Sequence, residues 1–170
     1  MSHKDVFVSI PTGGGKKLCF MIPALCSPPG SITIVISPLL SVIEEQVMQS
    51  RTLAIPCCSL GYNQTDQDLY NDLSSGNIKI LFVTPERIVR SGGLLSRLDL
   101  LYSRQQLDRF VINEAHCVSQ MGHDFRADYK DLSLLKQRFP SVPILAMTTI
   151  ATKKVIMDVL QTLQISKSCV

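Results

Sequence analysis

The sequence lacks the features that mark secreted, membrane-spanning or zinc-stabilised chains. Its six cysteines include no C-x-x-C pair, so the ligand spacing of a structural zinc site is missing. No signal peptide precedes Lys4, and no apolar run reaches the roughly 20 residues that a membrane-spanning helix needs. We therefore expect reduced thiols and an intracellular protein with no membrane partner, placed in the nucleus if its organism is eukaryotic.

The sequence also lacks a strong excess of charge of either sign. A net charge of +3 permits a phosphate-bearing partner but does not establish one. No internal repeat and no low-complexity linker divides the 170 residues, of which 45% are hydrophobic. This length and composition predict one domain over residues 1–170 with a substantial buried core.

Short apolar runs rich in β-branched residues recur between turn residues, as expected of strands that are buried on both faces. They lie at 6–10, 32–37, 78–84, 109–113 and 143–148. Segments with helical spacing alternate with them, at 39–50, 129–139 and 151–163 and from near Lys17. The turn-rich stretch 59–77 is expected to form a loop, a polar helix and another loop. This order predicts an α/β fold with a doubly wound, mostly parallel sheet and helices on both faces, in which ligands bind beyond the carboxyl ends of the strands.

A glycine-rich turn, IPTGGGKK at 10–17, joins the first expected strand to the first expected helix. Glycines allow consecutive backbone N–H groups to face one anion, and the helix N-terminus adds positive potential. Lys16 is placed to reach the β and γ phosphates of a nucleoside triphosphate. The candidate cofactor-binding residues are Pro11, Thr12, Gly13, Gly14, Gly15, Lys16 and Lys17. The alternative is an ordinary glycine-rich turn between a strand and a helix.

Lys17 stands where a phosphate cradle of this kind usually has the Ser or Thr that ligates magnesium. An ammonium cannot ligate a cation, and at ~4 Å in an effective dielectric of ~20 it would repel a divalent ion by up to roughly 8 kcal/mol before relaxation. Two interpretations stay open. Lys17 leans on the phosphates, so that nucleotide binds without magnesium, or it points outward from the first turn of the helix.

The end of the strand at 109–113 carries Asn113 and Glu114. Paired acids at such a place divide the work, because one holds magnesium and the other orients or deprotonates the attacking water. Asn113 keeps the shape of Asp without its charge, so Glu114 remains as a possible base while a metal anchor is lost. Together with Lys17, this predicts that hydrolysis is slow or absent, and we name no residue as a metal ligand.

Four motifs in order resemble the RecQ family of DNA helicases within helicase superfamily 2. They are SHKDVFVSIPTGGGK, VISPLLSVIEEQV (35–47), FVTPERI (82–88) and NEAHCVSQMGHDFRADY (113–129), followed by LAMTTIAT (145–152). The resemblance covers almost the whole chain and implies a RecA-like lobe that binds ATP, with Mg²⁺, and single-stranded or partly duplex DNA. Joined to a second RecA-like lobe in cis or in trans, such a lobe moves 3′ to 5′ and unwinds duplexes in DNA repair and recombination.

The resemblance also implies roles for individual residues. It makes Glu114 the catalytic acid beside Asn113, with His116 coupling this site to the next motif. The residues expected to contact nucleic acid are Ser37, Pro38, Thr84, Ser119, Gln120, Met121, His123, Phe125 and Arg126. Those expected to couple the motifs are Thr148, Thr149 and Thr152. On the helix at 39–50, the apolar stripe is expected to pack on the sheet, while Glu44, Glu45 and Gln46 are expected to be solvated or near DNA.

The chain departs from the family pattern at several of these positions. Met121 replaces the usual Trp, Ala127 replaces the usual Pro, and TTIAT replaces TATAT, which changes Thr149 and Ile150. Two functions therefore remain open. The chain is the N-terminal lobe of an ATP-dependent helicase, or it is an inactive pseudo-helicase lobe that binds nucleic acid or regulates a partner.

Overall fold

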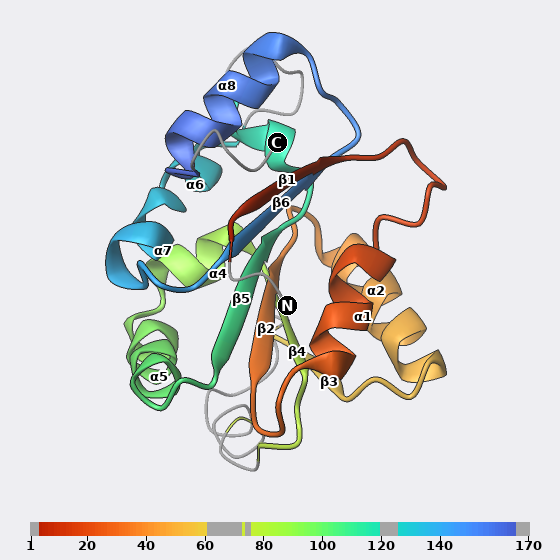
Figure 1. Ribbon diagram of the computed structural model, residues 1–170, viewed down its shortest axis with the longest axis vertical. Helices are drawn as coiled ribbons and strands as arrows, with labels where there is room; N and C mark the ends of the chain where they lie inside the picture. The colour runs from red at the N-terminus through yellow and green to blue at the C-terminus, as the bar shows by residue number, and fades with distance from the viewer. Residues whose placement is uncertain (1–3, 61–72, 74–75, 120–125, 166–170) are drawn as a thin grey trace.

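The computed structural model describes residues 4–60, 73, 76–119 and 126–165. Within these residues, six strands form one parallel sheet in the order β1-β6-β5-β2-β4-β3 (Figure 1). The strands are β1 (Val6–Ser9), β2 (Ile32–Ile36), β3 (Cys57–Ser59), β4 (Ile80–Val83), β5 (Leu107–Ile112) and β6 (Ile144–Thr148). Because all strands are parallel, their carboxyl ends share one edge of the sheet.

The sheet confirms the five strands expected from the sequence, with ends that shift by one or two residues. It also contains β3, which was not predicted; only its last residue, Ser59, lies in the stretch 59–77 that was expected to begin with a loop. This strand is only three residues long, and its sequence, CCS, has no β-branched residue to mark it. It lies at the edge of the sheet beside β4, where a short strand is common.

Helices cover both faces of the sheet (Figure 1). On one face lie α1 (Leu18–Cys26) and α2 (Leu40–Thr52). On the other lie α4 (Pro85–Arg90), α5 (Gly92–Ser103), α6 (Ala127–Lys130), α7 (Ser133–Arg138) and α8 (Lys153–Thr162), with the 3₁₀ turn η1 (Ala115–Val118) after β5. None of the helices that the structure describes is both long and apolar enough to cross a membrane.

Each central strand buries side chains on both faces, which explains its nearly continuous apolar sequence. On β2, Ile34 and Ile36 belong to the core beneath α4–α8, while Val35 belongs to the core beneath α1 and α2. On β5, Phe110 and Val111 divide in the same way. A nearly continuous apolar strand is therefore one that packs against helices on both faces of the sheet.

The single helix expected over 129–139 is divided into α6 and α7. Three-residue backbone hydrogen bonds, Leu132 N to Tyr129 O and Leu135 N to Leu132 O, tighten the chain between them. This tighter spacing turns Tyr129, Leu132, Leu135 and Phe139 to the same core, where each is fully buried. The single-helix prediction was therefore wrong, because burial of four large side chains outweighs the regular spacing.

Candidate functional site

The glycine-rich turn between β1 and α1 forms an exposed cradle at the carboxyl edge of the sheet. Gly13 and Gly15 adopt φ of 82° and 80°, a conformation that other residues rarely adopt. Gly14 is needed for another reason, since a Cβ there would overlap the side chain of Ile10. The backbone N–H of Leu18 closes the turn onto Gly15 O at 2.9 Å, so α1 begins directly at the cradle.

Four side chains from separate segments meet beside the cradle, and we call them the acid side: Lys16, Glu114, His116 and Thr148. Lys16 Nζ lies 3.0 Å from Glu114 Oε1, and both side chains are largely shielded, with 14% and 27% of their surface exposed. Glu114 Oε2 lies 3.5 Å from His116 Nδ1, which in turn lies 2.9 Å from Thr148 Oγ1. The contacts thus join the cradle, the end of β5 and the end of β6 in one line of polar groups.

Hydrogen-bond accounting favours one tautomer for His116. The hydroxyl of Thr148 accepts from Ile150 N at 3.0 Å and lies 3.1 Å from Ile150 O, to which it can only donate. Since a hydroxyl has a single proton, the histidine contact is satisfied when Nδ1 carries hydrogen and donates to Thr148 Oγ1. In that state Nε2 is an acceptor, and the imidazole is held in one orientation.

A second line of buried polar groups starts at Asn113, and we call it the amide side: Asn113, Ser37 and Gln46. Asn113 Nδ2 donates to Ser37 Oγ at 3.2 Å, and Ser37 Oγ donates to Gln46 Oε1 at 3.3 Å. All three residues are buried, at 4%, 0% and 3% exposed. The expectation that Gln46 is solvated was wrong, because position 46 follows Ile43 by three residues and shares its core-facing side of α2.

Lys17 is held by α2 in an arrangement that we call the lysine clamp: Lys17, Glu45 and Gln49. Its ammonium donates to Glu45 Oε1 at 2.7 Å and to Gln49 Oε1 at 2.6 Å, while Gln49 Nε2 donates to Glu45 at 2.8 Å. The hydrogen bond from Lys17 lowers the pKa of the Glu45 carboxyl from its ordinary value. Of the two interpretations of Lys17, this geometry favours the side chain that is engaged outside the cradle.

Tyr129 supports the end of β5 from below. Its hydroxyl donates to the backbone carbonyl of Asn113 at 2.8 Å, and burial raises the pKa of this phenol well above its ordinary value. Glu114 adopts a left-handed backbone, with φ of 50° and ψ of 48°, directly after this anchored carbonyl. The turn places the side chains of Asn113 and Glu114 on different sides, so that one enters the amide side and the other the acid side.

The residues expected to contact nucleic acid have several different environments. Ser37 is buried within the amide side, and Ser119 Oγ donates to Asp158 Oδ2 of α8 at 2.6 Å. Thr84 is half-buried and caps α4 by accepting from Arg87 N. Arg126 donates through Nη1 to Pro38 O at 2.9 Å, which joins two of the segments that were expected to contact DNA.

Four of the expected nucleic-acid residues, Gln120, Met121, His123 and Phe125, lie outside the described residues. Both flanks of that segment are fixed, by the Ser119–Asp158 contact and the Arg126–Pro38 contact. Of the expected coupling residues, Thr148 joins the acid side, Thr149 is half-buried after β6, and Thr152 is exposed and caps α8 by accepting from Val155 N. Gln49 and Asp158 were not predicted from the sequence, because their partners Lys17 and Ser119 are distant in sequence.

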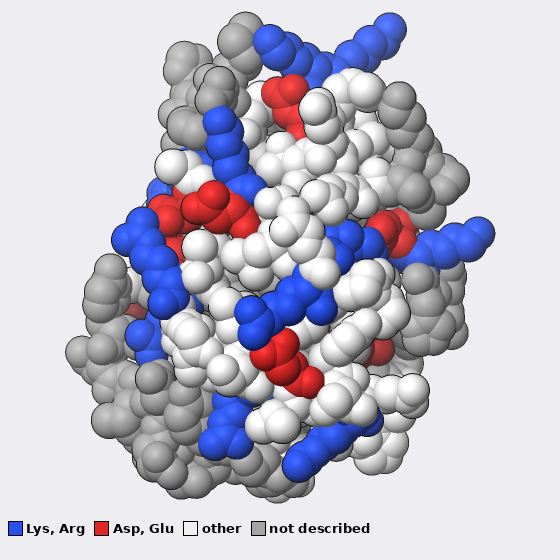
Figure 2. Space-filling model, turned by 90° about the vertical axis from the view of Figure 1, so that its left-hand side faces the viewer, with Lys and Arg blue, Asp and Glu red and all other residues white. Residues whose placement is uncertain are grey.

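The face formed by α4–α8 has no concentrated basic patch in the part that the structure describes. Figure 2 shows Lys and Arg spread over this face, with Asp and Glu between them. Arg90 pairs with Asp128 at 2.8 Å, and Arg138 pairs with Asp99 at 2.6 Å. Paired charges of this kind leave little net potential to attract a phosphate backbone.

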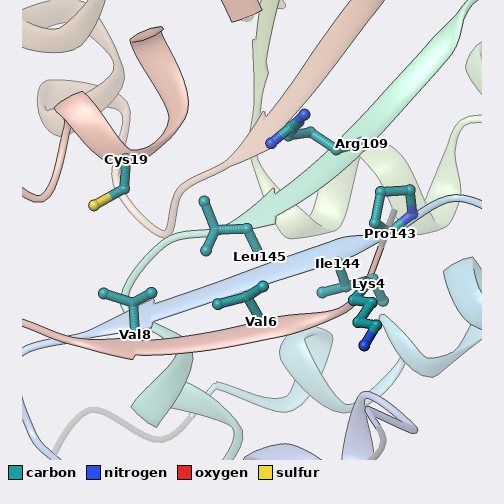
Figure 3. Close-up of a pocket in the computed structure, with 8 residues that line it drawn as sticks. All are labelled: Lys4, Val6, Val8, Cys19, Arg109, Pro143, Ile144 and Leu145. Atoms are coloured by element: carbon teal, nitrogen blue, oxygen red, sulfur yellow. The ribbon is translucent and has the colours of Figure 1, made fainter. Parts of the chain in front are cut away.

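A groove of about 310 Å³ opens over the other face of β1 and β6, beside α1 (Figure 3). Its walls are mainly apolar, with Val6 and Val8 from β1, Leu145 from β6 and Cys19 from α1. It also reaches Lys4 and Pro143, at the amino ends of these strands. None of the cradle residues 11–17 lines this groove, so it is separate from the candidate phosphate site.

The donor set at the cradle edge does not fit a magnesium ion. Mg²⁺ is usually held by one or two carboxylates together with substrate phosphates. The position for the hydroxyl ligand carries the clamped ammonium of Lys17, and Asn113 offers a neutral amide whose nitrogen already donates to Ser37. Glu114 is paired with Lys16, and among the described residues no three His, Cys, Asp or Glu side chains form a metal-binding group.

Comparison with known proteins places this geometry in a family. The family model described as DEAD/DEAH box helicase matches residues 1–159. "RecQ-like DNA helicase BLM" of Xenopus laevis is 48% identical over 169 residues, which cover 96% of this chain and 12% of that protein. "ATP-dependent DNA helicase Q-like 4B" of Arabidopsis thaliana is 50% identical over 168 residues, covering 96% of this chain and 14% of that protein. The chain thus spans about an eighth of the length of these relatives.

Solved structures support the fold. The structure titled "DEAD-box helicase Mss116 bound to ssRNA and UDP-BeF" superimposes with a TM-score of 0.70 at 18% identity, covering 99% of this chain and 36% of that one. The helicase domain of Pyrococcus furiosus Hef gives a TM-score of 0.67 at 21% identity, covering 96% of this chain and 34% of that one. At such low identity these similarities show a RecA-like fold alone. The chain belongs to the DEAD/DEAH box helicase family, as a RecA-like lobe similar to that of RecQ-like DNA helicases.

Proposed function

We propose that the chain is the N-terminal nucleotide- and DNA-binding lobe of a RecQ-type, ATP-dependent 3′ to 5′ DNA helicase that acts in repair or recombination. The observation that carries this proposal is the acid side, because it joins the phosphate cradle to the ends of β5 and β6 through Lys16, Glu114 and His116. The names of the two relatives described above, both DNA helicases, support the same assignment. In a eukaryotic cell, the site of action would be nuclear DNA.

In this proposal Lys16 and the cradle N–H groups bind the phosphates, which brings the γ phosphate close to Glu114. Glu114 accepts a proton from water, and His116 transmits the position of Glu114 to Thr148 at the end of β6. Single-stranded or partly duplex DNA would lie across the segments that contain Pro38 and Arg126, whose contact fixes their spacing. A second RecA-like lobe, in cis or in trans, would complete the site.

The same proposal states that hydrolysis is slow or absent. Lys17 and Asn113 remove the oxygen ligand and the carboxylate on which the reaction usually relies, and each loss of 1.36 kcal/mol in transition-state stabilisation costs about tenfold in rate. These two residues also support the second candidate function, a pseudo-helicase lobe that binds nucleic acid or a partner without turning over ATP. Both candidates share the binding of phosphate-bearing ligands at this edge.

DNA-stimulated ATP hydrolysis tests the proposal in the longest natural form of the chain. We expect the natural form to be silent, and the variant with Lys17→Ser and Asn113→Asp to gain turnover of at least about a hundredfold. Adding Glu114→Gln to that variant should remove the gain, because the proposed base is then lost.

Robust turnover by the natural form would contradict the proposed loss of hydrolysis and would identify a working motor lobe. Silence of both forms, with DNA binding retained, would favour the pseudo-helicase function. Silence together with no binding of single-stranded DNA would overturn the proposed function.

A further inference from the structure

Two positions, 17 and 113, usually supply the protein ligands of magnesium in such a site. The first of them is taken up by the lysine clamp. Lys17 Nζ is within 2.7 Å of both Glu45 Oε1 and Gln49 Oε1, and Gln49 also donates to Glu45, so the three groups form a closed set of hydrogen bonds. A cation near the phosphates would find no hydroxyl oxygen from position 17, because the side chain there is an ammonium held by α2 outside the cradle.

The second position, 113, is taken up by the amide side, in which the direction of the hydrogen bonds suits an amide. Ser37 has one hydroxyl proton, which it donates to Gln46 Oε1, so its oxygen must accept from residue 113. An amide can supply that proton, whereas an ionised carboxylate can only accept. Position 113 therefore carries a neutral amide that is engaged with Ser37, and it lacks the carboxylate charge that would hold magnesium. A carboxylate there would require the Ser37 and Gln46 hydrogen bonds to reverse their direction.

Glu114, the remaining carboxylate at this edge, competes with a nucleotide for the ammonium of Lys16. Its Oε1 lies 3.0 Å from Lys16 Nζ, the group that would contact the terminal phosphates. In a site with magnesium the metal offsets the charge of such a carboxylate, but here an ammonium and a neutral amide stand at positions 17 and 113, which usually supply its ligands. Phosphate and Glu114 would then share a single ammonium.

We infer that this lobe binds the nucleoside triphosphate as its metal-free anion, on the cradle N–H groups and Lys16, and that Glu114 weakens this binding. The inference rests on the proposed nucleotide-binding function and names the form of the ligand. Magnesium ions compete with the site for the phosphate oxygens and bring a charge that the edge does not accommodate. The affinity for ATP should consequently gain nothing from magnesium.

Isothermal titration of the chain with ATP tests the inference, once with Mg²⁺ and once with a chelator at matched ionic strength. We expect the affinity with the chelator to equal or exceed that with Mg²⁺. Glu114→Gln should tighten metal-free binding by about tenfold, as expected when a competing charge-assisted contact of about 1.4 kcal/mol is removed. Glu44→Gln makes the same charge change on the exposed surface of α2 and should leave the affinity unchanged.

Three results would count against the inference. Binding that is tenfold tighter with Mg²⁺ would overturn it while leaving the proposed nucleotide binding intact. An unchanged affinity for metal-free ATP in Glu114→Gln would show that Glu114 does not compete with the phosphates for Lys16. An absence of ATP binding under both conditions would overturn the inference together with the nucleotide-binding part of the proposed function, which distinguishes that failure from the first. A positive control is the variant with Lys17→Ser and Asn113→Asp, which should acquire dependence on Mg²⁺.

Discussion

The acid side and the lysine clamp lie at the same edge of the sheet, but they hold charge in opposite ways. On the acid side, Lys16 and Glu114 are largely shielded and continue into a buried histidine. In the clamp, Lys17 and Glu45 have 35% and 58% of their side chains exposed. Shielded polar groups are costly to leave without a partner, whereas exposed ion pairs contribute little to stability. The comparison shows that the acid side is built into the fold and that the clamp is an addition at its surface.

The strongest test of the difference between the acid side and the clamp is a change at Thr148, the inner end of the acid side. Thr148→Val keeps the shape of the side chain but leaves His116 Nδ1 and Ile150 N without their hydroxyl partner. We expect a loss of about 2 kcal/mol in the free energy of unfolding, because the buried imidazole of His116 and the partly buried N–H of Ile150 each lose a hydrogen bond. Urea unfolding measures this loss.

Thr33→Val is the matched control for this change. Thr33 is also fully buried on a central strand, but its hydroxyl makes one long hydrogen bond, to Asp108 at 3.3 Å. A smaller loss is expected there. If the two variants lose equal stability, the acid side is no more tightly built than the rest of the sheet.

Tyr129 sharpens the comparison because it anchors the carbonyl of Asn113, from which the chain turns into the acid side. Tyr129→Phe should cost about 1 kcal/mol at neutral pH through loss of that hydrogen bond. Burial raises the pKa of Tyr129 in the folded protein, so its contribution is complete below the unfolded pKa of about 10 and is lost as pH rises toward the folded value. Alkaline unfolding should therefore be less steep in the variant.

Tyr102→Phe provides the control for this pH dependence. Tyr102 is half-buried and accepts from Ser141 Oγ at 2.9 Å, so the change removes a phenol without opening the core below β5. Equal alkaline unfolding curves for the natural protein and Tyr129→Phe would mean that a group other than Tyr129 controls the loss of stability at high pH.

The strands and the cradle could be predicted from the sequence because each is encoded locally. A central strand such as β2 is buried at all five positions and apolar at four of them, and the cradle glycines follow a strand directly. The replacements at Lys17 and Asn113 were also visible in the sequence, as departures from a known motif. What each replacement contacts was not, since Lys17 and Glu45 are 28 residues apart and Asn113 and Ser37 are 76 apart. Such partners are decided by strand order and helix packing, which a local pattern does not contain.

The smallest effect is expected at the lysine clamp itself. Lys17→Met removes the hydrogen bond that lowers the pKa of Glu45, so that pKa should return toward 4.5. Because the folded pKa is lowered, the pair contributes stability above the unfolded value and loses it as pH falls through the folded value. Both groups are at the surface, so the unfolding free energy at neutral pH should hardly change, and salt should screen what remains. An NMR titration of the Glu45 carboxyl carbon measures the shift directly.

Arg138→Met, which removes the exposed partner that lowers the pKa of Asp99, gives a matched reference for a surface pair. If the clamp is an addition at the surface, the two variants should change stability by similarly small amounts. A loss in Lys17→Met that approaches the loss in Thr148→Val would contradict the comparison. It would mean that the ammonium has become part of the folded framework, so that restoring a hydroxyl at position 17 would destabilise the lobe before it could restore a metal site.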